Sequence, residues 1–480
     1  MRFHGIVAKA GARLLGCVLA ASFLTMGGNW AHAYDPLEER AQLRRNAARG
    51  LEYVPTSTAS GSAGTRHAVK VVPSVKVSIH GNALDNAYSS LLPLDFNGNG
   101  TSEYLIWNGH KSMRVYGRAG NRVWEVLNPN GRVLNANIYI HRDQAAVLDL
   151  DGDKKEDVLH CWQSGTTKKL VERSGATGKE IRSVTLSGQG TGAPTQYCRI
   201  SVYYKESDKQ PIILVAHSQS TSGACGGRNY TDNWARVVAY DKNLKLLWST
   251  NTCDAGHVTA GVDENDDGYY EYVFVGKYAL DFNGKIRCTL SGWDSSDHVD
   301  AVRVARMAPG DSEKSVVAIG RTGGGMFDRS SCSRKWTVPV SNPQEMAVFQ
   351  MDPAPAPLSI LVTNRGGSSD SVVTTVLTNK GAKVRTIAKR IMPMQNAQMD
   401  GYKRDDEVIG IFGEVFNGKG ESLMTKGWYW DLKGTNVTEK STSNSYDKWV
   451  AYPLLYDMDN DGKEEMVTWG QSLIVEGELQ

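Results

Sequence analysis

The chain has 480 residues and a formal net charge of +2, with 54 Lys and Arg against 52 Asp and Glu. This near balance gives no support to a nucleic-acid partner, because such partners are usually met by a strongly basic surface. After residue 33 no stretch approaches the about 20 consecutive apolar residues that a membrane-spanning helix needs.

The first 33 residues have the three-part form of a secretory signal. A segment with three basic residues leads into the apolar run Leu14 to Met26, and Ala31-His-Ala33 fits a cleavage site. Cleavage there removes three basic and no acidic residues, which changes the formal charge from +2 to −1. We therefore expect a secreted or periplasmic protein without a membrane span.

Residues 34–68 are expected to form an N-terminal segment that ends in the small-residue linker TSTASGSAGT. Beyond this linker, acidic turns recur between short apolar strands. The clearest unit is HRDQAAVLDLDGDKKEDVLHCW, in which the strand 145–148 leads to an acidic turn and to a second strand ending at His160. Similar turns begin at Asp95, Asp263 and Asp457, and weaker ones lie near residues 206, 309, 352 and 404.

Eight turns at a spacing of roughly 40 to 60 residues predict an array of β units. Continuous apolar runs beside the turns suit strands that are buried on both faces, and long helical periodicity is absent. We therefore predict an all-β fold, a single β-propeller over residues 69–480 with seven or eight blades. The last unit, 449–475, is one strand short, and residues 68–79 could supply that strand.

The acidic turns also resemble calcium loops. A hard cation prefers several oxygen ligands, and a Gly permits the sharp turn. The predicted calcium ligands are Asp149, Asp151, Asp153, Asp157, Asp263, Asn265, Asp267, Glu271, Asp457, Asp459, Asp461 and Glu465. The alternative is that these are solvated hairpin turns without metal.

Six cysteines remain after the signal, and in an oxidising compartment disulfides are the first expectation. The alternative is a structural zinc site built from Cys253 and His257 with Cys225 and a further ligand. No CxxC pair is present to strengthen it.

The acidic turns resemble the FG-GAP or VCBS-type repeats of calcium-binding propellers. Residues 260–365 resemble rhamnogalacturonan lyases more specifically, in the sequences Asp281-Phe-Asn-Gly-Lys285, Asp297-His-Val-Asp300-Ala and Ala308-Pro-Gly-Asp311. The shorter length and an early His pair are more similar to secreted ulvan lyases. That resemblance implies His, Tyr and Arg in a cleft across the ring, with calcium and zinc mainly structural.

Antiparallel hairpins return the start of the first strand and the end of the second strand to one edge. We therefore expect His141 and His160 to meet there as a proton-transfer pair, as the ulvan-lyase resemblance also implies. A Gly-rich excursion would add Arg228 for uronate neutralisation, with Tyr230 or Tyr197 as the phenol. Predicted substrate-binding residues on the same edge are His217, Lys277, His298, Arg321 and Arg365.

The expected partner is an anionic polysaccharide, and the expected state is a monomer. β-Elimination at a uronate needs a cation, a base and an acid, and imidazoles suit the proton steps. The first hypothesis is a polysaccharide lyase acting on ulvan, with rhamnogalacturonan as the alternative polymer. The second is a non-enzymatic, calcium-dependent carbohydrate-binding propeller. A hydrolase is weaker, because no carboxylate pair outside the turns has a useful spacing.

Overall fold

The computed structural model describes only part of the chain, and all of that part belongs to one compact unit, Arg44–Gln480. The described residues are 71–78, 89–108, 112–127, 131–133, 145–164, 167–186, 198–218, 235–254, 256, 258–293, 297–349, 351, 356–364, 373–387, 395–397, 407–409, 415–416, 427–430, 437–440, 454–459, 465–469 and 473–479. The predicted boundaries at residues 33 and 68 lie outside them.

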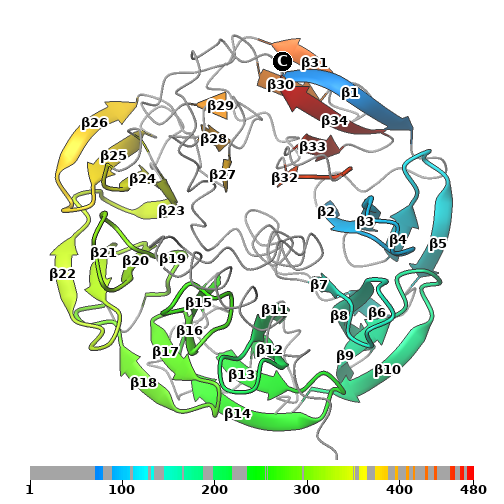
Figure 1. Cartoon of the computed structure of the whole chain (residues 1–480), viewed down its shortest axis with the longest axis horizontal. Helices are drawn as coiled ribbons and strands as arrows, with labels where there is room; N and C mark the ends of the chain where they lie inside the picture. Colours follow the sequence, from blue (N-terminus) through cyan, green and yellow to red (C-terminus); the bar gives the residue numbers. More distant parts are fainter. Residues whose placement is uncertain are drawn as a thin grey trace, which may run out of the picture. The chain divides into compact units, whose positions relative to one another are not determined.

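Within these residues every regular element is a β-strand, as predicted. No described helix has the length and apolar character needed to cross a membrane. The strands form antiparallel sheets, most of them four-stranded and built from consecutive strands (Figure 1).

Three sheets follow one another from residue 89 to residue 252. The first contains β2 (Ser89–Leu94), β3 (Glu103–Asn108), β4 (Ser112–Tyr116) and β5 (Arg122–Leu127). The second contains β6 (Gly131–Val133), β7 (Ala145–Leu148), β8 (Asp157–Ser164), β9 (Thr167–Arg173) and β10 (Glu180–Thr185), with β6 and β7 both paired to β8. The third contains β11 (Cys198–Tyr204), β12 (Pro211–Ser218), β13 (Ala235–Tyr240) and β14 (Leu246–Thr252).

Three more four-stranded sheets continue the series. They are β15 (Thr259–Val262), β16 (Tyr272–Val275), β17 (Tyr278–Asp281) and β18 (Ile286–Thr289); β19 (Ala301–Ala305), β20 (Ser315–Gly320), β21 (Gly323–Asp328) and β22 (Arg334–Thr337); and β23 (Pro343–Phe349), β24 (Ser359–Asn364), β25 (Thr374–Thr378) and β26 (Lys383–Ile387). Shorter sheets follow, β27 (Gln395–Ala397) with β28 (Glu407–Ile409) and β29 (Val415–Phe416), and β30 (Gly427–Trp430) with β31 (Val437–Lys440).

The last sheet joins the two ends of the described chain. β32 (Leu454–Tyr456), β33 (Glu465–Trp469) and β34 (Leu473–Leu479) pair in order, and β1 (Val71–Ser78) adds to β34 as the fourth strand. The predicted contribution of residues 68–79 to the last unit is therefore confirmed. This sheet packs on the first one through a shared apolar cluster and through Tyr104, whose hydroxyl donates to the buried carboxylate of Glu476.

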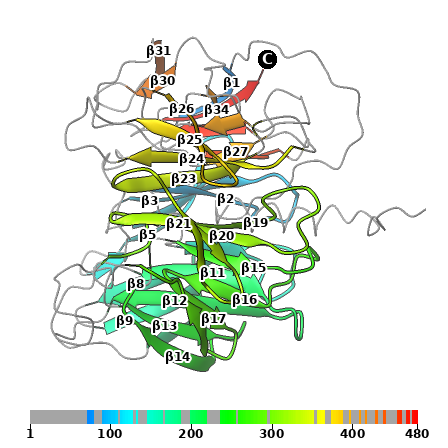
Figure 2. The same cartoon turned by 90° about the vertical axis from the view of Figure 1, so that its left-hand side faces the viewer.

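Burial follows the position of a strand within its sheet. Every residue of β16, β20 and β23 is buried, whereas β10, β18 and β26 are partly exposed along their length. This confirms that the continuous apolar runs in the sequence mark strands covered on both faces. Apolar clusters link each four- or five-stranded sheet to the next one in sequence, from β2–β5 to β23–β26. Figure 2 shows β19–β21 between β15–β17 and β23–β26. These features are propeller-like.

A tryptophan on the fourth strand secures three of these interfaces. Trp124, Trp248 and Trp336 each donate their indole N–H to a backbone carbonyl in the turn between the third and fourth strands of the next sheet. The residue two positions before that sheet's fourth strand is glycine, Gly178, Gly284 or Gly381, with positive φ. A Cβ there would come within 2.7 Å of the indole ring, so the ring requires the glycine.

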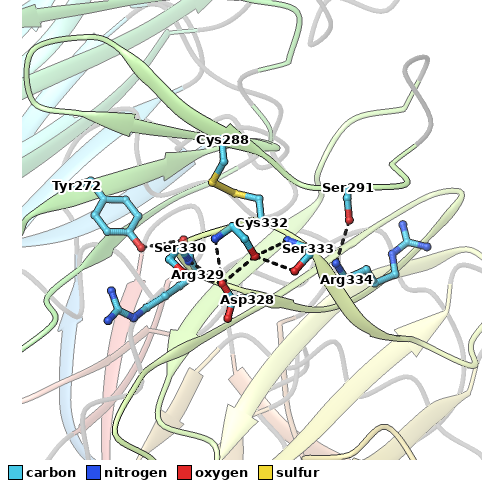
Figure 3. Close-up of a disulfide and its surroundings, with 10 residues drawn as sticks. Tyr272, Cys288, Ser291, Asp328, Arg329, Ser330, Cys332, Ser333 and Arg334 are labelled. Atoms are coloured by element: carbon cyan, nitrogen blue, oxygen red, sulfur yellow. Dashed lines mark hydrogen bonds between the residues drawn. A yellow bond between two sulfur atoms is a disulfide. The ribbon is translucent and has the colours of Figure 1, made fainter.

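The two interfaces that alternate with these three have a residue other than glycine at the same turn position. Leu244 (φ 59°) is buried in the cluster that joins sheets β6–β10 and β11–β14, and Cys332 (φ 57°) forms a disulfide with Cys288 of β18 (Figure 3). A second disulfide, between Cys161 and Cys198, crosses the former interface. Each described disulfide therefore lies at an interface that has no tryptophan of this kind.

Candidate functional site

Several predicted site residues lie outside the described part of the chain. They are His141, Tyr197, Arg228, Tyr230, Arg365, His257, Cys225 and Asp461. Their predicted roles stay predictions.

His160 lies inside a strand rather than at its end. β8 continues to Ser164, four residues beyond the predicted end of the second strand, which was therefore placed too early. The His160 imidazole is completely buried, and its Nε2 accepts a hydrogen bond of 2.9 Å from Nε of Arg173. The Trp162 ring packs edge-on against it, with ring centroids 5.6 Å apart.

This environment keeps the His160 imidazole neutral. Burial, and then the positive charge of Arg173, lower the pKa of His160 to about 3. The lone pair of Nε2 is occupied by Arg173, and no atom of the ring reaches solvent. These contacts are those of a packing residue at the interface with sheet β2–β5, and they do not match the open groove expected around a proton-transfer group.

The edge predicted from hairpin geometry exists in the described sheets. Ala301, at the start of β19, pairs with Ile319 near the end of β20, and Thr259 of β15 pairs with Val275 of β16. We call this edge the rim. The rim of the two sheets β15–β18 and β19–β22 carries the predicted substrate-binding residues Lys277, His298 and Arg321.

His298 lies between two carboxylates of its own segment. Its Nε2 is 3.1 Å from Oδ1 of Asp300, its Nδ1 is 4.0 Å from Oδ1 of Asp297, and its side chain is 17% exposed. When Nε2 donates to Asp300, Nδ1 is the nitrogen that can accept a proton. His298 thus combines access to solvent with an oriented ring, a combination that His160 lacks.

Neighbouring strands hold the two carboxylates. Oδ2 of Asp297 accepts hydrogen bonds of 2.7 Å from both the backbone N–H and the hydroxyl of Thr322, which follows β20. Oδ2 of Asp300 accepts a bond of 3.0 Å from Nε2 of Gln344 in β23. The ring of His298 is therefore positioned by groups from two consecutive sheets.

The remaining predicted cations differ in exposure. Lys277 follows β16 and is buried, with its Nζ 5.9 Å from the ring centre of Tyr278, whereas Arg321 follows β20 and is exposed. His217 is buried in β12, opposite Cys198 and Arg236. Of these groups, Arg321 is the one with an exposed side chain.

The acidic turns share one hydrogen-bond pattern. Oδ1 and Oδ2 of Asp149 accept the backbone N–H groups of Gly152 and Lys154, respectively. In the same way, Oδ1 and Oδ2 of Asp263 accept the backbone N–H groups of Asp266 and Gly268. This pattern rigidifies the loop between a first and a second strand.

Among the described residues, two sets of three acidic side chains lie close enough together to hold a metal ion, with the ligand atoms of each set within 4.8 Å of one another. They are Asp149 with Asp151 and Asp153, and Asp457 with Asp459 and Glu465. Burial, together with the nearby charges of Asp459 and Asp457, raises the pKa of Glu465 to about 8. A bound cation would relieve that cost. These oxygen donors fit calcium.

The other predicted calcium ligands are arranged differently. Oδ2 of Asp157 is buried and makes no hydrogen bond, and this residue is not part of the converging group. The acidic side chains of the third turn, Asp263, Asp267 and Glu271, form no such group, and Nζ of Lys209 lies 3.2 Å from Oδ2 of Asp267. Calcium at that turn, which would also use Asn265, stays a prediction.

The zinc alternative is wrong for Cys253, because this cysteine is disulfide-bonded and offers no thiolate. With Cys161–Cys198 and Cys288–Cys332, all five cysteines among the described residues are in disulfides. That state fits an oxidising compartment.

Sequence reasoning missed the groups that orient His298. Asp297 and Asp300 stood in the motif that carried the resemblance, but neither was given a role. The available signal was an Asp-His-x-Asp string directly before an apolar strand. Thr322 and Gln344 had no signal, since their contribution depends on which strand ends meet at the rim.

No protein-family model matches the sequence, and no curated protein matches it. The structure is similar to a Bacillus licheniformis rhamnogalacturonan lyase of family PL11, with TM-score 0.56 and 17% identity over 85% of this chain and 75% of that chain. It is similar to rhamnogalacturonan lyase YesW, with TM-score 0.57 and 16% identity over 86% and 74%. It is also similar to the V. cholerae biofilm matrix protein Bap1, with TM-score 0.53 and 12% identity over 85% and 91%. At these identities the likeness establishes the fold alone.

Proposed function

We propose that the protein is an exported polysaccharide lyase that cleaves a uronate-containing polymer by β-elimination at the rim around His298. The observation that carries the proposal is the oriented, solvent-reaching imidazole of His298 between Asp297 and Asp300. The fold shared with rhamnogalacturonan lyases supports it.

The chemistry requires three groups. A base removes the C5 proton of the uronate, a cation neutralises its carboxylate, and an acid protonates the leaving oxygen. We assign the base to His298 and the exposed cation to Arg321, and the acid is unassigned. His141 and His160 were predicted as the proton-transfer pair; the burial of His160 shifts that role to His298 in our proposal.

Rhamnogalacturonan is the polymer we place first, because the structures similar to this chain include rhamnogalacturonan lyases. Ulvan was the first expectation from the sequence and becomes the second candidate. Both polymers carry uronates, so the proposed chemistry is the same for each.

We further propose eight blades. Seven sheets are four- or five-stranded, and the short strands β27–β31 lie in the chain between the sheets β23–β26 and β32–β34. One blade built from β27–β31 would complete the series.

Calcium, in our proposal, is bound by the converging groups at Asp149 and Asp457 and stabilises the loops without taking part in the reaction. A chelator should therefore lower the melting temperature, and added Ca²⁺ should restore it. The double substitution Asp151→Asn with Asp153→Asn should reduce this shift, while Asp241→Asn, in a turn outside both groups, should not. An unchanged melting temperature with chelator would contradict the proposed sites.

A second candidate function is non-enzymatic binding of carbohydrate. The similarity to the biofilm matrix protein Bap1, which extends over 91% of that protein's chain, favours it. A binding module would need the rim cations but no base.

One experiment separates the two functions. The full chain is incubated with rhamnogalacturonan, ulvan and alginate, and the ultraviolet absorbance of unsaturated uronate is followed. A rising absorbance that disappears when the uronate carboxylates are chemically reduced supports the lyase. Saturable binding of a polymer without new absorbance supports the binding module. If the protein neither produces the absorbance nor binds a polymer, both functions are refuted.

A further inference from the structure

One buried carboxylate beside the rim has no role in the site described above. Asp254 precedes β15 and is 0% exposed. Its Oδ1 accepts the backbone N–H of Gly256 at 2.5 Å, and its Oδ2 accepts the backbone N–H of Val299 at 3.2 Å. Asp254 therefore ties the start of sheet β15–β18 to the residue next to His298 in the neighbouring sheet.

Two glycines show how closely the backbone is packed around this carboxylate. A Cβ on Gly276, which follows β16, would lie 2.6 Å from Oδ2 of Asp254 and 2.8 Å from the backbone N of Gly256. A Cβ on Gly256 would lie 2.7 Å from Cα of Gly276 and 3.0 Å from the carbonyl oxygen of Val299. Both glycines have positive φ. Three segments of backbone thus meet at one side chain.

The charged groups near Asp254 include two residues of the candidate site, His298 and Lys277. Burial raises the pKa of Asp254 to about 6, while the N–H of Gly256 and the positive charges of His298 and Lys277 act in the opposite direction. A carboxylate that accepts two backbone N–H groups beside a lysine is favoured in its ionised form near neutral pH.

We propose that Asp254 is a positioning residue that fixes the segment Asp297–Asp300, and with it the ring of His298, at the rim. Asp297 is held by Thr322 from the same sheet, and Asp300 by Gln344 from the following sheet. Asp254 supplies the third attachment, from the preceding sheet, through Val299. The expected change in kcat rests on the proposed function, whereas the structural role of Asp254 does not.

Asp254→Asn tests the inference with little change in volume. The amide cannot accept from both Gly256 and Val299, because only one of its two terminal atoms is an acceptor. We expect kcat on the cleaved polymer to fall about 10²-fold, the scale of a small misplacement of a catalytic group, with KM within about twofold.

The structural readout does not require activity. Histidine labelled with ¹³C gives an imidazole signal for His298, which is assigned by its loss in His298→Gln. In Asp254→Asn we expect this signal to shift and its titration midpoint to move, because Asp254, Asp297, Asp300 and Lys277 set the charge around the ring. Wild-type protein in the same buffer is the reference.

Asp241→Asn is the matched control. Oδ1 of Asp241 also accepts two backbone N–H groups, from Asn243 and Lys245, but in the turn between β13 and β14. This variant should leave both the His298 signal and kcat unchanged. Gly276→Ala is a second probe, since its Cβ would displace the Asp254 carboxylate from the other side. It should shift the His298 signal in the same way.

The outcomes separate the two proposals. If wild-type protein cleaves none of the three polymers, the proposed function fails, and the His298 signal alone decides on Asp254. An unchanged His298 signal in Asp254→Asn refutes the positioning role, whether or not activity or melting temperature has changed. A shifted signal in both Asp254→Asn and Gly276→Ala, and not in Asp241→Asn, supports it.

Discussion

His160 and His298 were both expected on one edge of the molecule, and the structure gives them opposite environments. His160 is completely buried and accepts a hydrogen bond from Arg173, whereas the side chain of His298 is 17% exposed and is flanked by two carboxylates. His160 lies in the middle of β8, whereas His298 precedes β19. Their chemistry differs because one belongs to a strand and the other precedes one.

The difference shows what the pleat does to a polar residue in a sheet that is covered on both faces. Every side chain of an inner strand points into an interface, so His160 must be neutral and hydrogen-bonded there. A residue before the strand is released from that alternation and can face solvent. Residues just outside strands are therefore the better candidates for chemistry in this fold.

His298→Ala should have the largest effect on function. Loss of the proposed base should lower kcat/KM on the polymer by about 10²- to 10⁴-fold, as expected for general acid–base catalysis. Product absorbance measures the activity, and circular dichroism checks that the fold is intact. Full activity in a folded His298→Ala protein would remove this residue from the mechanism.

Asp300→Asn should reduce activity less, by about tenfold. The carboxylate holds Nε2 of His298, and a hydrogen bond to a charged group is worth about 1.5–3 kcal/mol. Gln344→Ala, which removes a hydrogen bond to Oδ2 of Asp300, should have a smaller effect in the same assay. Equal activity in Asp300→Asn and wild type would show that the ring needs no such orientation.

His160→Ala should change stability instead of activity. It leaves the buried Nε of Arg173 without its acceptor, which costs about 1–3 kcal/mol in the free energy of unfolding, apart from the cavity left behind. Urea unfolding measures this loss, and activity per folded molecule should match wild type. Loss of activity at unchanged stability would restore His160 to the site.

The pH dependence of stability should carry a smaller signature of His160. Its pKa in the folded protein, about 3, lies below the unfolded value of about 6.5, so the unfolded chain binds more protons between these limits. This contribution to stability is complete above pH 6.5 and declines as the pH falls, by at most about 1.4 kcal/mol per pH unit. Unfolding of wild type and His160→Ala between pH 7 and 5 should show a shallower slope in the variant.

The fold was predictable because its signals are local and repeated. Acidic turns between short apolar runs marked the hairpins, and a missing strand in the last unit indicated the pairing now seen between β1 and β34. The turn position that alternates between Gly178, Leu244, Gly284 and Cys332 was not predictable. Its residue type depends on whether the preceding sheet supplies a tryptophan.

Only the location of the proposed site could be anticipated from the sequence. Hairpin geometry indicated the edge at which we propose the site and included His298, but it could not rank the histidines. When both faces of a strand are apolar, sequence alternation does not show which face a residue such as His160 occupies or where its strand ends. The buried Asp254 carried no local signal, since its partner Val299 is 45 residues away.

The pairing of β1 with β34 has a mechanical consequence. Val71 lies opposite Leu479 and Ser78 opposite Leu473. The N-terminal end of β1 and the C-terminal end of β34 are therefore at the same end of the strand pair. A force that separates these two ends would load the terminal hydrogen bonds first and peel the strands apart one residue pair at a time. Tension applied through both termini should therefore open the molecule at low force, beginning at this seam.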